Sequence, residues 1–170
     1  MNFEQAFALV IDVEKGLSMD PRDPGNWTGG KIGVGTLKGS KYGISSKAFP
    51  NEDIQNLTLD RAKELAKTLY WDRFNCDKFP GQIAYNVFDT AYNGGHPIIW
   101  LQQIIGAKVD GVVGDETITK ANAADVNAVV AIFNSLRSDY ITELGDDWWL
   151  SQGRGVQRRI NKNTRITAKC

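Results

Sequence analysis

The stretch VIDVEKGLSMDPRDPGNW at residues 10–27 contains four carboxylates, of which Glu14, Asp20 and Asp23 have the surroundings and spacing for chemistry. Glu14 follows a run of apolar residues, whereas Asp20 and Asp23 each precede a proline in a polar segment. A carboxyl group on an apolar surface has a raised pKa and can serve as a general acid, while one in a polar loop stays ionised. Hydrolysis of a glycosidic bond uses carboxyl groups in two such environments. The stretch is therefore a candidate site for that chemistry.

The apolar pattern around Glu14 predicts a helix that begins after an N-cap at Asn2 and ends near Gly16. At about 100° per residue, one face of this helix carries the apolar residues Phe3, Ala6, Phe7, Val10, Ile11, Val13 and Leu17. Glu14 lies on that same face, four residues after Val10. Two alternatives stay open on spacing alone. In the first alternative, the Glu14 side chain turns outward to solvent or to a lysine. In the second, the Asp-Pro pairs serve only as turn starters.

The rest of the chain is predicted to be mostly helical, with a small β-hairpin in a loop. Residues 20–43 are rich in glycine, proline and polar side chains and form this loop. Later helices are predicted from prolines and capping residues. They are 58–75 with Thr58 as cap, 80–93 from Pro80 to Gly94, 97–105 from Pro97 to Gly106, a short helix capped by Asp115, and 125–144 with Asp125 as cap.

Composition narrows the classes of function. The 170 residues include 20 acidic and 20 basic side chains, which argues against a dominant nucleic-acid-binding surface. With one histidine and two cysteines, Cys76 and Cys170, we predict no metal site and no cofactor. The segment DPRDPGNWTGG lacks the ligand spacing of an EF-hand. His96 precedes Pro97 and is predicted to be a capping or surface residue.

The sequence also carries expectations about location. No apolar run approaches the roughly 20 residues that a transmembrane helix needs. The N-terminus contains Glu4 and lacks the basic region of a secretory signal peptide. We therefore expect synthesis in the cytoplasm without a signal peptide, and export or release by another route if the target lies outside.

The stretch EKGLSMDPRDPGN, followed by KYGIS, resembles the E-G-G-Y-x-x-D-P-x-D-P-G-G-x-T-N-x-G-I-T signature of glycoside hydrolase family 108. Members of that family are lysozyme-like N-acetylmuramidases, found as phage endolysins and as secretion-associated wall hydrolases. They cleave the β-1,4 bond between N-acetylmuramic acid and N-acetylglucosamine in bacterial peptidoglycan. The resemblance implies a lysozyme-like, mostly α fold and makes Glu14 the catalytic acid. Without a signal peptide, a holin or a secretion apparatus would be the export partner.

The second half supports the same family. The stretch VFDTAYNGGHPIIWLQQIIGAKVDGVVGDETITKANA resembles the predicted peptidoglycan-binding segment that follows the catalytic part in these proteins. The matching residues are Asp89, Asn93, Gly94, Leu101, Gln102, Gly106, Asp110, Gly111, Gly114, Thr117 and Ala121. The resemblance implies a catalytic part at residues 1–80 and a helical binding part at 81–170, packed as one globular unit.

The chain also departs from the family pattern. Lys15 replaces the first glycine after the glutamate, and Leu17 replaces the aromatic residue. An insertion around residues 29–40 lengthens the step before Ser45, which stands where the family has threonine. The position of Ser45 relative to Glu14 therefore stays open.

The resemblance assigns roles to individual residues. Lysozyme-like folds often place glutamate and aspartate nine positions apart, which favours Asp23 over Asp20 as the second carboxylate and leaves Asp20 to brace the loop. Ser45 either positions the attacking water or caps a turn. Sugar rings stack on aromatic faces and N-acetyl groups need amide-type hydrogen bonds, so the candidate substrate-binding residues are Tyr42, Tyr92, Trp27 and Asn93. For each aromatic residue, a place in the core is an open alternative.

Two alternatives to the N-acetylmuramidase function remain open from the sequence alone. A lytic transglycosylase works with one glutamate and makes an anhydro sugar. A non-catalytic wall-binding or secretion-assembly protein would keep the scaffold without the chemistry, and the intact Glu14 argues against it. Whether hydrolysis inverts or retains the anomeric centre depends on the separation of the two carboxyl groups.

Overall fold

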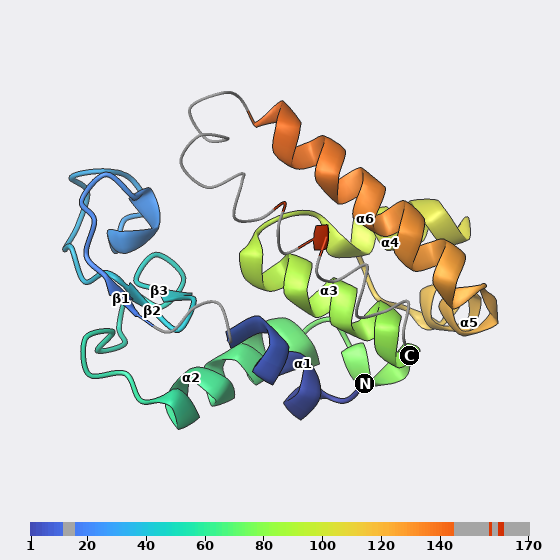
Figure 1. Ribbon diagram of the computed structural model, residues 1–170, viewed down its shortest axis with the longest axis horizontal. Coiled ribbons are helices and arrows are strands. Elements are labelled where there is room, and N and C mark those ends of the chain that lie inside the picture. Colours follow the sequence, from blue (N-terminus) through green and yellow to red (C-terminus); the bar gives the residue numbers. More distant parts are fainter. Residues whose placement is uncertain (12–15, 145–156, 158–159, 162–170) are drawn as a thin grey trace. The chain divides into compact units, whose positions relative to one another are not determined.

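The computed structural model describes residues 1–11, 16–144, 157 and 160–161, and its elements are mostly helices with one small antiparallel sheet (Figure 1). The predicted fold class is therefore confirmed. By its internal contacts the chain divides into two compact units, one of residues 4–69 and one of residues 1–3 with 70–170. The division of function at residue 80 stays a prediction.

The first helix, α1 (Phe3–Ile11), buries Phe3, Ala6, Phe7 and Val10, as its apolar periodicity predicts. Val13 and Glu14 lie outside the described residues. The placement of Leu17 on this helical face is wrong. Leu17 begins strand β1 (Leu17–Ser18), and its side chain is 44% exposed. Its backbone pairs with Lys41, a partner that helical periodicity cannot reveal.

The three-stranded sheet has the order β1-β2-β3, with β2 at Ser40–Lys41 and β3 at Ile44–Ser45. The tight turn between β2 and β3 consists of Tyr42 and Gly43, with φ of 54° and 75°. Positive φ at both central residues is the backbone of a primed turn, whose twist matches that of the strands. The hairpin is thus at the end of the predicted loop, at 40–45.

The helix predicted at 58–75 is correct at its start and wrong at its end. The Thr58 side chain caps α2 (Leu59–Ala66) by accepting a hydrogen bond from the Arg61 N–H at 3.2 Å. The chain then widens into a π-helical segment, η2 (Lys67–Asp72). Asn75, with φ of 49°, turns the backbone into the short 3₁₀ helix η3 (Cys76–Lys78), because a left-handed residue ends a right-handed helix.

The second unit is built around α3 (Gly81–Asn93), which packs against both α4 (Pro97–Ile105) and α6 (Val126–Glu143). The starts at Pro80 and Pro97 are confirmed, and Gly106 ends α4 in the left-handed conformation. The Asp125 side chain caps α6, as predicted. For α5 (Asp115–Ala123) the N-cap is Gly114, so the capping role predicted for Asp115 is wrong. Its carboxylate lies one position inside, where it still favours the positive helix end.

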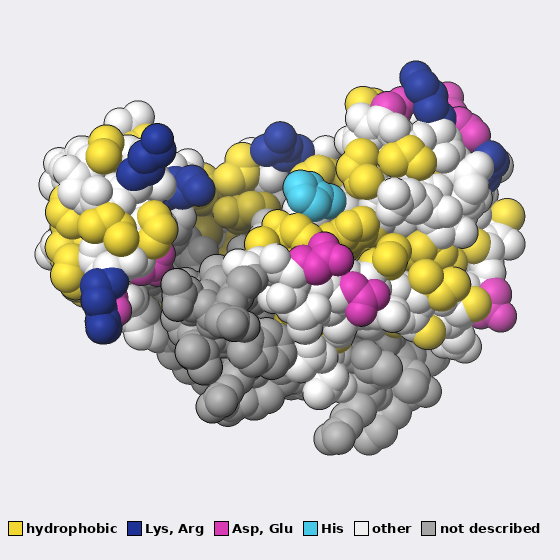
Figure 2. Space-filling model, turned by 90° about the horizontal axis from the view of Figure 1, so that it is seen from above, with side chains coloured by type: hydrophobic (Ala, Val, Ile, Leu, Met, Phe, Trp, Pro, Cys, Tyr) yellow, Lys and Arg dark blue, Asp and Glu magenta, His cyan; other side chains and the backbone are white. Residues whose placement is uncertain are grey.

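Within the described residues, no helix combines the length and the apolar character needed to cross a membrane. On the face that Figure 2 shows, the Lys and Arg side chains of the described residues are scattered and do not gather into one basic patch.

Candidate active site

The two aspartates of the candidate site lie in a loop that we call the acid loop, residues 18–27. The side chain of Asn26 is completely buried and holds this loop together. Its Nδ2 donates to the Asp20 carbonyl at 3.0 Å and to Ser18 Oγ at 3.3 Å. Its own carbonyl accepts hydrogen bonds from the N–H groups of Lys38 and Gly39, both at 3.1 Å. Asn26 was not anticipated from the sequence, where its only signal is an amide side chain directly after an Asp-Pro-Gly turn.

Asp20 is bound to its neighbour Arg22 through both carboxylate oxygens. Arg22 Nε lies 3.0 Å from Oδ1, and Arg22 Nη2 lies 2.8 Å from Oδ2. The Arg22 backbone N–H also donates to Oδ1. These hydrogen bonds from the Arg22 side chain and backbone lower the pKa of Asp20 to about 2. Asp20 is thus an ionised group whose hydrogen-bonding capacity is used within the loop, which agrees with a bracing role.

Asp23 uses only one carboxylate oxygen within the loop. Its Oδ1 accepts a hydrogen bond from the Gly25 N–H at 2.8 Å, which caps the 3₁₀ helix η1 (Pro24–Asn26). A Cβ on Gly25 would lie 3.1 Å from that oxygen, so the turn favours glycine. Among the described residues, Oδ2 has no hydrogen-bond or ion-pair partner. This half-buried carboxylate therefore has an oxygen left to accept a proton or to face a positive charge.

Glu14, the predicted general acid, lies outside the described residues. Its role stays a prediction, as does its separation from Asp23.

Ser45 takes part in a turn. Its Oγ accepts a hydrogen bond from the Ala48 N–H at 3.3 Å, and its carbonyl accepts from Ala48 and Phe49. This geometry favours the turn alternative for Ser45. The hydroxyl hydrogen can still donate to a water molecule, so the predicted role in positioning water is a separate question.

Two of the candidate aromatic residues belong to the first unit. Trp27 is half-buried, donates from Nε1 to the Pro21 carbonyl at 2.9 Å and pairs with Leu37 through a β-bridge. It thereby braces the acid loop. Tyr42 lies at the turn of the hairpin, with Lys41 Nζ 5.4 Å from its ring centroid. Both rings are half-buried, so each has surface that a sugar could contact.

The other two candidates lie at the end of α3 and differ from each other. Tyr92 is only 8% exposed and contacts the rings of Tyr70 and Phe88, at centroid distances of 5.0 and 5.7 Å. This favours its alternative place in the core. Asn93 is half-buried and its side chain binds back to Asp89. His96 reaches the surface, where it is the cyan side chain of Figure 2, and its ring contacts Trp100 and Tyr140.

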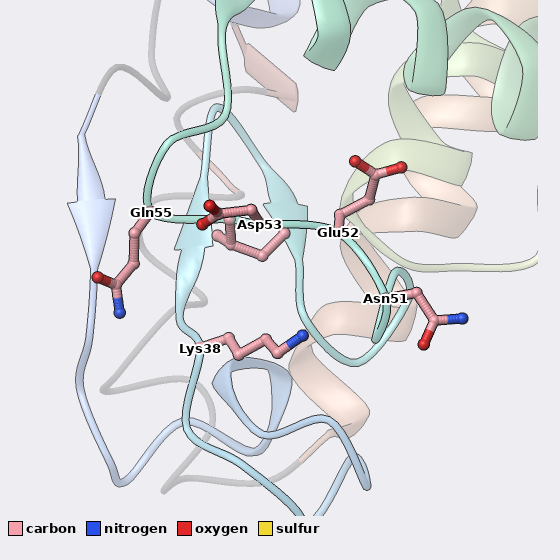
Figure 3. Close-up of a pocket in the computed structure, with 6 residues that line it drawn as sticks. Lys38, Asn51, Glu52, Asp53 and Gln55 are labelled. Atoms are coloured by element: carbon pink, nitrogen blue, oxygen red, sulfur yellow. The ribbon is translucent and has the colours of Figure 1, made fainter.

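A polar pocket of about 320 Å³ lies in the first unit and was not anticipated from the sequence. Figure 3 shows the residues that line it: Lys38, Asn51, Glu52, Asp53, Ile54 and Gln55. Its charged groups have partners within the protein, since Lys38 Nζ donates to the Pro50 carbonyl and Glu52 pairs with Arg61. Hydrogen bonds from Asn56 lower the pKa of Asp53, which keeps it ionised. The lining groups suit a polar, hydroxyl-bearing ligand.

The described residues contain no cluster of three or more His, Cys, Asp or Glu side chains that could hold a metal ion.

Comparisons with known proteins agree with the sequence signature. The family described as glycosyl hydrolase 108 matches residues 7–95, a segment that contains Glu14, Asp20, Asp23, Ser45 and Asn93. A solved structure, that of SagA from Brucella abortus, is similar with a TM-score of 0.80 and 20% sequence identity. The similarity covers 98% of this chain and 94% of SagA, so the two share a fold over nearly their whole length. No curated protein matches the chain.

Proposed function

We propose that this chain, which belongs to the glycosyl hydrolase 108 family, is an N-acetylmuramidase. Membership makes it a glycoside hydrolase, and the proposal adds the substrate and the bond. The substrate is bacterial peptidoglycan, and the bond is the β-1,4 linkage between N-acetylmuramic acid and N-acetylglucosamine. The family match over the segment that contains all three candidate carboxylates carries this proposal.

The proposed mechanism gives the two carboxyl groups opposite tasks. Glu14 donates its proton to the glycosidic oxygen as the bond from that oxygen to the anomeric carbon breaks. Asp23 faces the positive charge that develops on the sugar, or takes a proton from the water that attacks the anomeric carbon. Asp23 is preferred to Asp20 because its Oδ2 has no partner among the described residues, whereas Arg22 binds both oxygens of Asp20.

Substrate contacts are proposed for half-buried residues of both units, each unit being considered by itself. Tyr42 and Trp27 offer ring surface for sugar stacking, and Asn93 offers an amide for an N-acetyl group. Ser45 would hold the attacking water through its hydroxyl hydrogen, since its Oγ already accepts from Ala48. Tyr92 would act from the core, as support for the end of α3.

The proposed site of action is the cell wall or periplasm, after synthesis in the cytoplasm. A holin or a secretion apparatus would provide the route, as in endolysins and secretion-associated wall hydrolases. The measurable consequence is that expression in the bacterial cytoplasm lyses cells only when a membrane-permeabilising holin is co-expressed. Lysis without a holin would contradict a need for that partner.

Product analysis on purified peptidoglycan tests the proposed reaction, with Glu14→Gln as the matched variant. We expect reducing N-acetylmuramic acid ends from the native protein, and a loss of several orders of magnitude in Glu14→Gln. Anhydro-muramic ends would assign the protein to the lytic transglycosylases instead. Wall binding without any cleavage by the native protein would assign it to the non-catalytic class.

A further inference from the structure

The side-chain amide of Asn93, the last residue of α3, is held in one orientation. Its Nδ2 donates to the Asp89 carbonyl at 2.8 Å and lies 3.2 Å from Asp89 Oδ1. Both partners are acceptors, so only the NH₂ group of the amide can face them. The acceptor Oδ1 must therefore point the other way. Among the described residues, no hydrogen-bond donor reaches that Oδ1.

A buried ion pair fixes the group that orients Asn93. Asp89 Oδ2 lies 2.5 Å from Nη1 of Arg137 on α6, and the two side chains are 0% and 1% exposed. The two helices pack side by side (Figure 1). A charge-assisted hydrogen bond in a buried place holds both groups in one geometry. Since Arg137 holds one oxygen of Asp89, the other oxygen is kept in place for Asn93.

At the end of α3, Asn93 is half-buried and the following Gly94 is exposed. Gly94 and Gly95, with φ of 92° and 140°, turn the chain away directly after Asn93. A Cβ on Gly94 would meet no atom within 4 Å, so the space beside Gly94, the residue after Asn93, is open. A Cβ on Gly95 would instead lie 2.7 Å from Thr90 and 2.9 Å from Trp100, which keeps this turn close to the helix. The result is a fixed hydrogen-bond acceptor at an open surface.

A fixed, uncharged acceptor can bind a neutral donor without the need for a counter-charge. The acetamido group of an N-acetylated sugar has one amide N–H, which matches a single acceptor in geometry and charge. We infer that Asn93 Oδ1 accepts a hydrogen bond from the acetamido N–H of a sugar in the substrate, with Asp89 and Arg137 as positioning residues. This inference rests on the proposed function and names the part of the glycan that Asn93 recognises.

The test compares two ligands that differ only in the N–H. One is a soluble tetrasaccharide of alternating N-acetylglucosamine and N-acetylmuramic acid, and the other carries acetoxy groups in place of the acetamido groups. Binding is measured by calorimetry in a Glu14→Gln background, so that no ligand is cleaved. We expect the acetamido ligand to bind about tenfold more tightly, because the ester leaves Oδ1 without a donor. In Asn93→Ala this ratio should fall to about one.

Asn122 supplies a matched control, since its Nδ2 also donates to the carbonyl four residues earlier, that of Ile118, at 2.8 Å. Asn122→Ala should leave the tenfold ratio unchanged. The positioning role is tested with the double variant Asp89→Asn/Arg137→Met, which avoids leaving one buried charge unpaired. In this variant the Asp89 backbone carbonyl still accepts from Asn93, but the fixed carboxylate oxygen is replaced by an amide that can also donate. The Asn93 amide is then held less firmly, so the ratio should fall while the acetoxy ligand binds as before. A merely structural role would weaken both ligands equally.

The possible outcomes distinguish failure of this inference from failure of the proposed function. A tenfold ratio that persists in Asn93→Ala overturns the recognition role, and one that persists in the double variant overturns the positioning role. If the acetamido tetrasaccharide does not bind and native protein leaves peptidoglycan intact, the proposed function fails together with the inference. If peptidoglycan is cleaved and the two ligands bind equally to the native protein, only the inference fails.

Discussion

The two aspartates of the acid loop differ in what their carboxylates already bind, and this difference predicts opposite results for the same substitution. Asp23→Asn keeps an Oδ1 that accepts from the Gly25 N–H, so the turn is preserved while the charge is lost. If Asp23 is the second carboxylate, activity on peptidoglycan should fall by about 10²–10⁴-fold. Asp20→Asn should change activity only a few-fold, since that carboxylate already binds Arg22 at an exposed position.

Thermal unfolding provides the control for this pair, because both variants should remain folded. A large loss of activity in Asp20→Asn with little change in Asp23→Asn would reverse the assignment. The sequence identifies both aspartates as candidates, and the resemblance favours Asp23 by its spacing from Glu14 without giving a physical reason for that ranking. Their ranking follows from hydrogen bonds with Arg22 and Gly25, which depend on the backbone path of the loop. Asn26, which fixes that path from a buried position, has no periodicity by which to recognise it.

At the scale of elements, the turn between β2 and β3 predicts a trade between stability and binding. Tyr42 has a φ of 54°, a conformation that costs a residue with a large side chain on the order of 1 kcal/mol. Asparagine tolerates it better and is common in primed turns. The contact of Lys41 with the half-buried Tyr42 ring is worth about 0.5 kcal/mol, which is less than the strain that asparagine relieves. Tyr42→Asn should raise the midpoint of thermal unfolding.

The same substitution removes the ring that is proposed to stack on a sugar, so the KM for peptidoglycan fragments should rise. Tyr42→Phe is the matched variant, since it keeps both the ring and the strained backbone. It should leave the unfolding midpoint and the KM close to the native values. A Tyr42→Asn protein that is less stable than Tyr42→Phe would show that the turn stores no strain, and an unchanged KM would remove Tyr42 from the substrate contacts.

Helix boundaries were predictable where a local signal sets them. The caps at Thr58 and Asp125, and the glycine that ends α4 at residue 106, act on their own helix within one turn. The failures lie where a distant partner decides. Leu17 continues the apolar periodicity of α1, yet its pairing with Lys41 makes it a strand. The helix after Thr58 has no breaker in its sequence before it widens at Lys67.

At the scale of the whole molecule, the burial and pairing of titratable groups are the features that the sequence predicts least well. Asp89 and Arg137 are 48 residues apart, so no local pattern predicts their pairing. Cys76 is a second example, since it is completely buried although it follows the polar residues of a helix end. Burial of the Cys76 thiol connects packing to pH, because the thiol titrates in the unfolded chain at a pH where the folded protein keeps its proton.

Two groups, Cys76 and Tyr70, are expected to lower the free energy of unfolding at alkaline pH. Burial, with smaller contributions from Asp77 and Asp72, raises the pKa of the Cys76 thiol. Burial also raises the pKa of Tyr70, partly offset by Arg73. Thiols in an unfolded chain ionise near pH 8.5 and phenols near pH 10. Since the folded state then binds more protons, the free energy of unfolding should fall by about 1.4 kcal/mol per pH unit above pH 8.5. The slope should steepen above pH 10.

Single variants separate the two contributions, and each keeps the other as an internal control. Urea unfolding in a Cys170→Ser background leaves Cys76 as the only thiol. Cys76→Ala lowers the overall stability by creating a small cavity, yet it should remove the slope between pH 8.5 and pH 10. Tyr70→Phe should leave that slope and remove only the steeper part above pH 10. A slope that survives in Cys76→Ala would mean that the thiol ionises equally in the folded and unfolded states, which contradicts its complete burial in the folded protein.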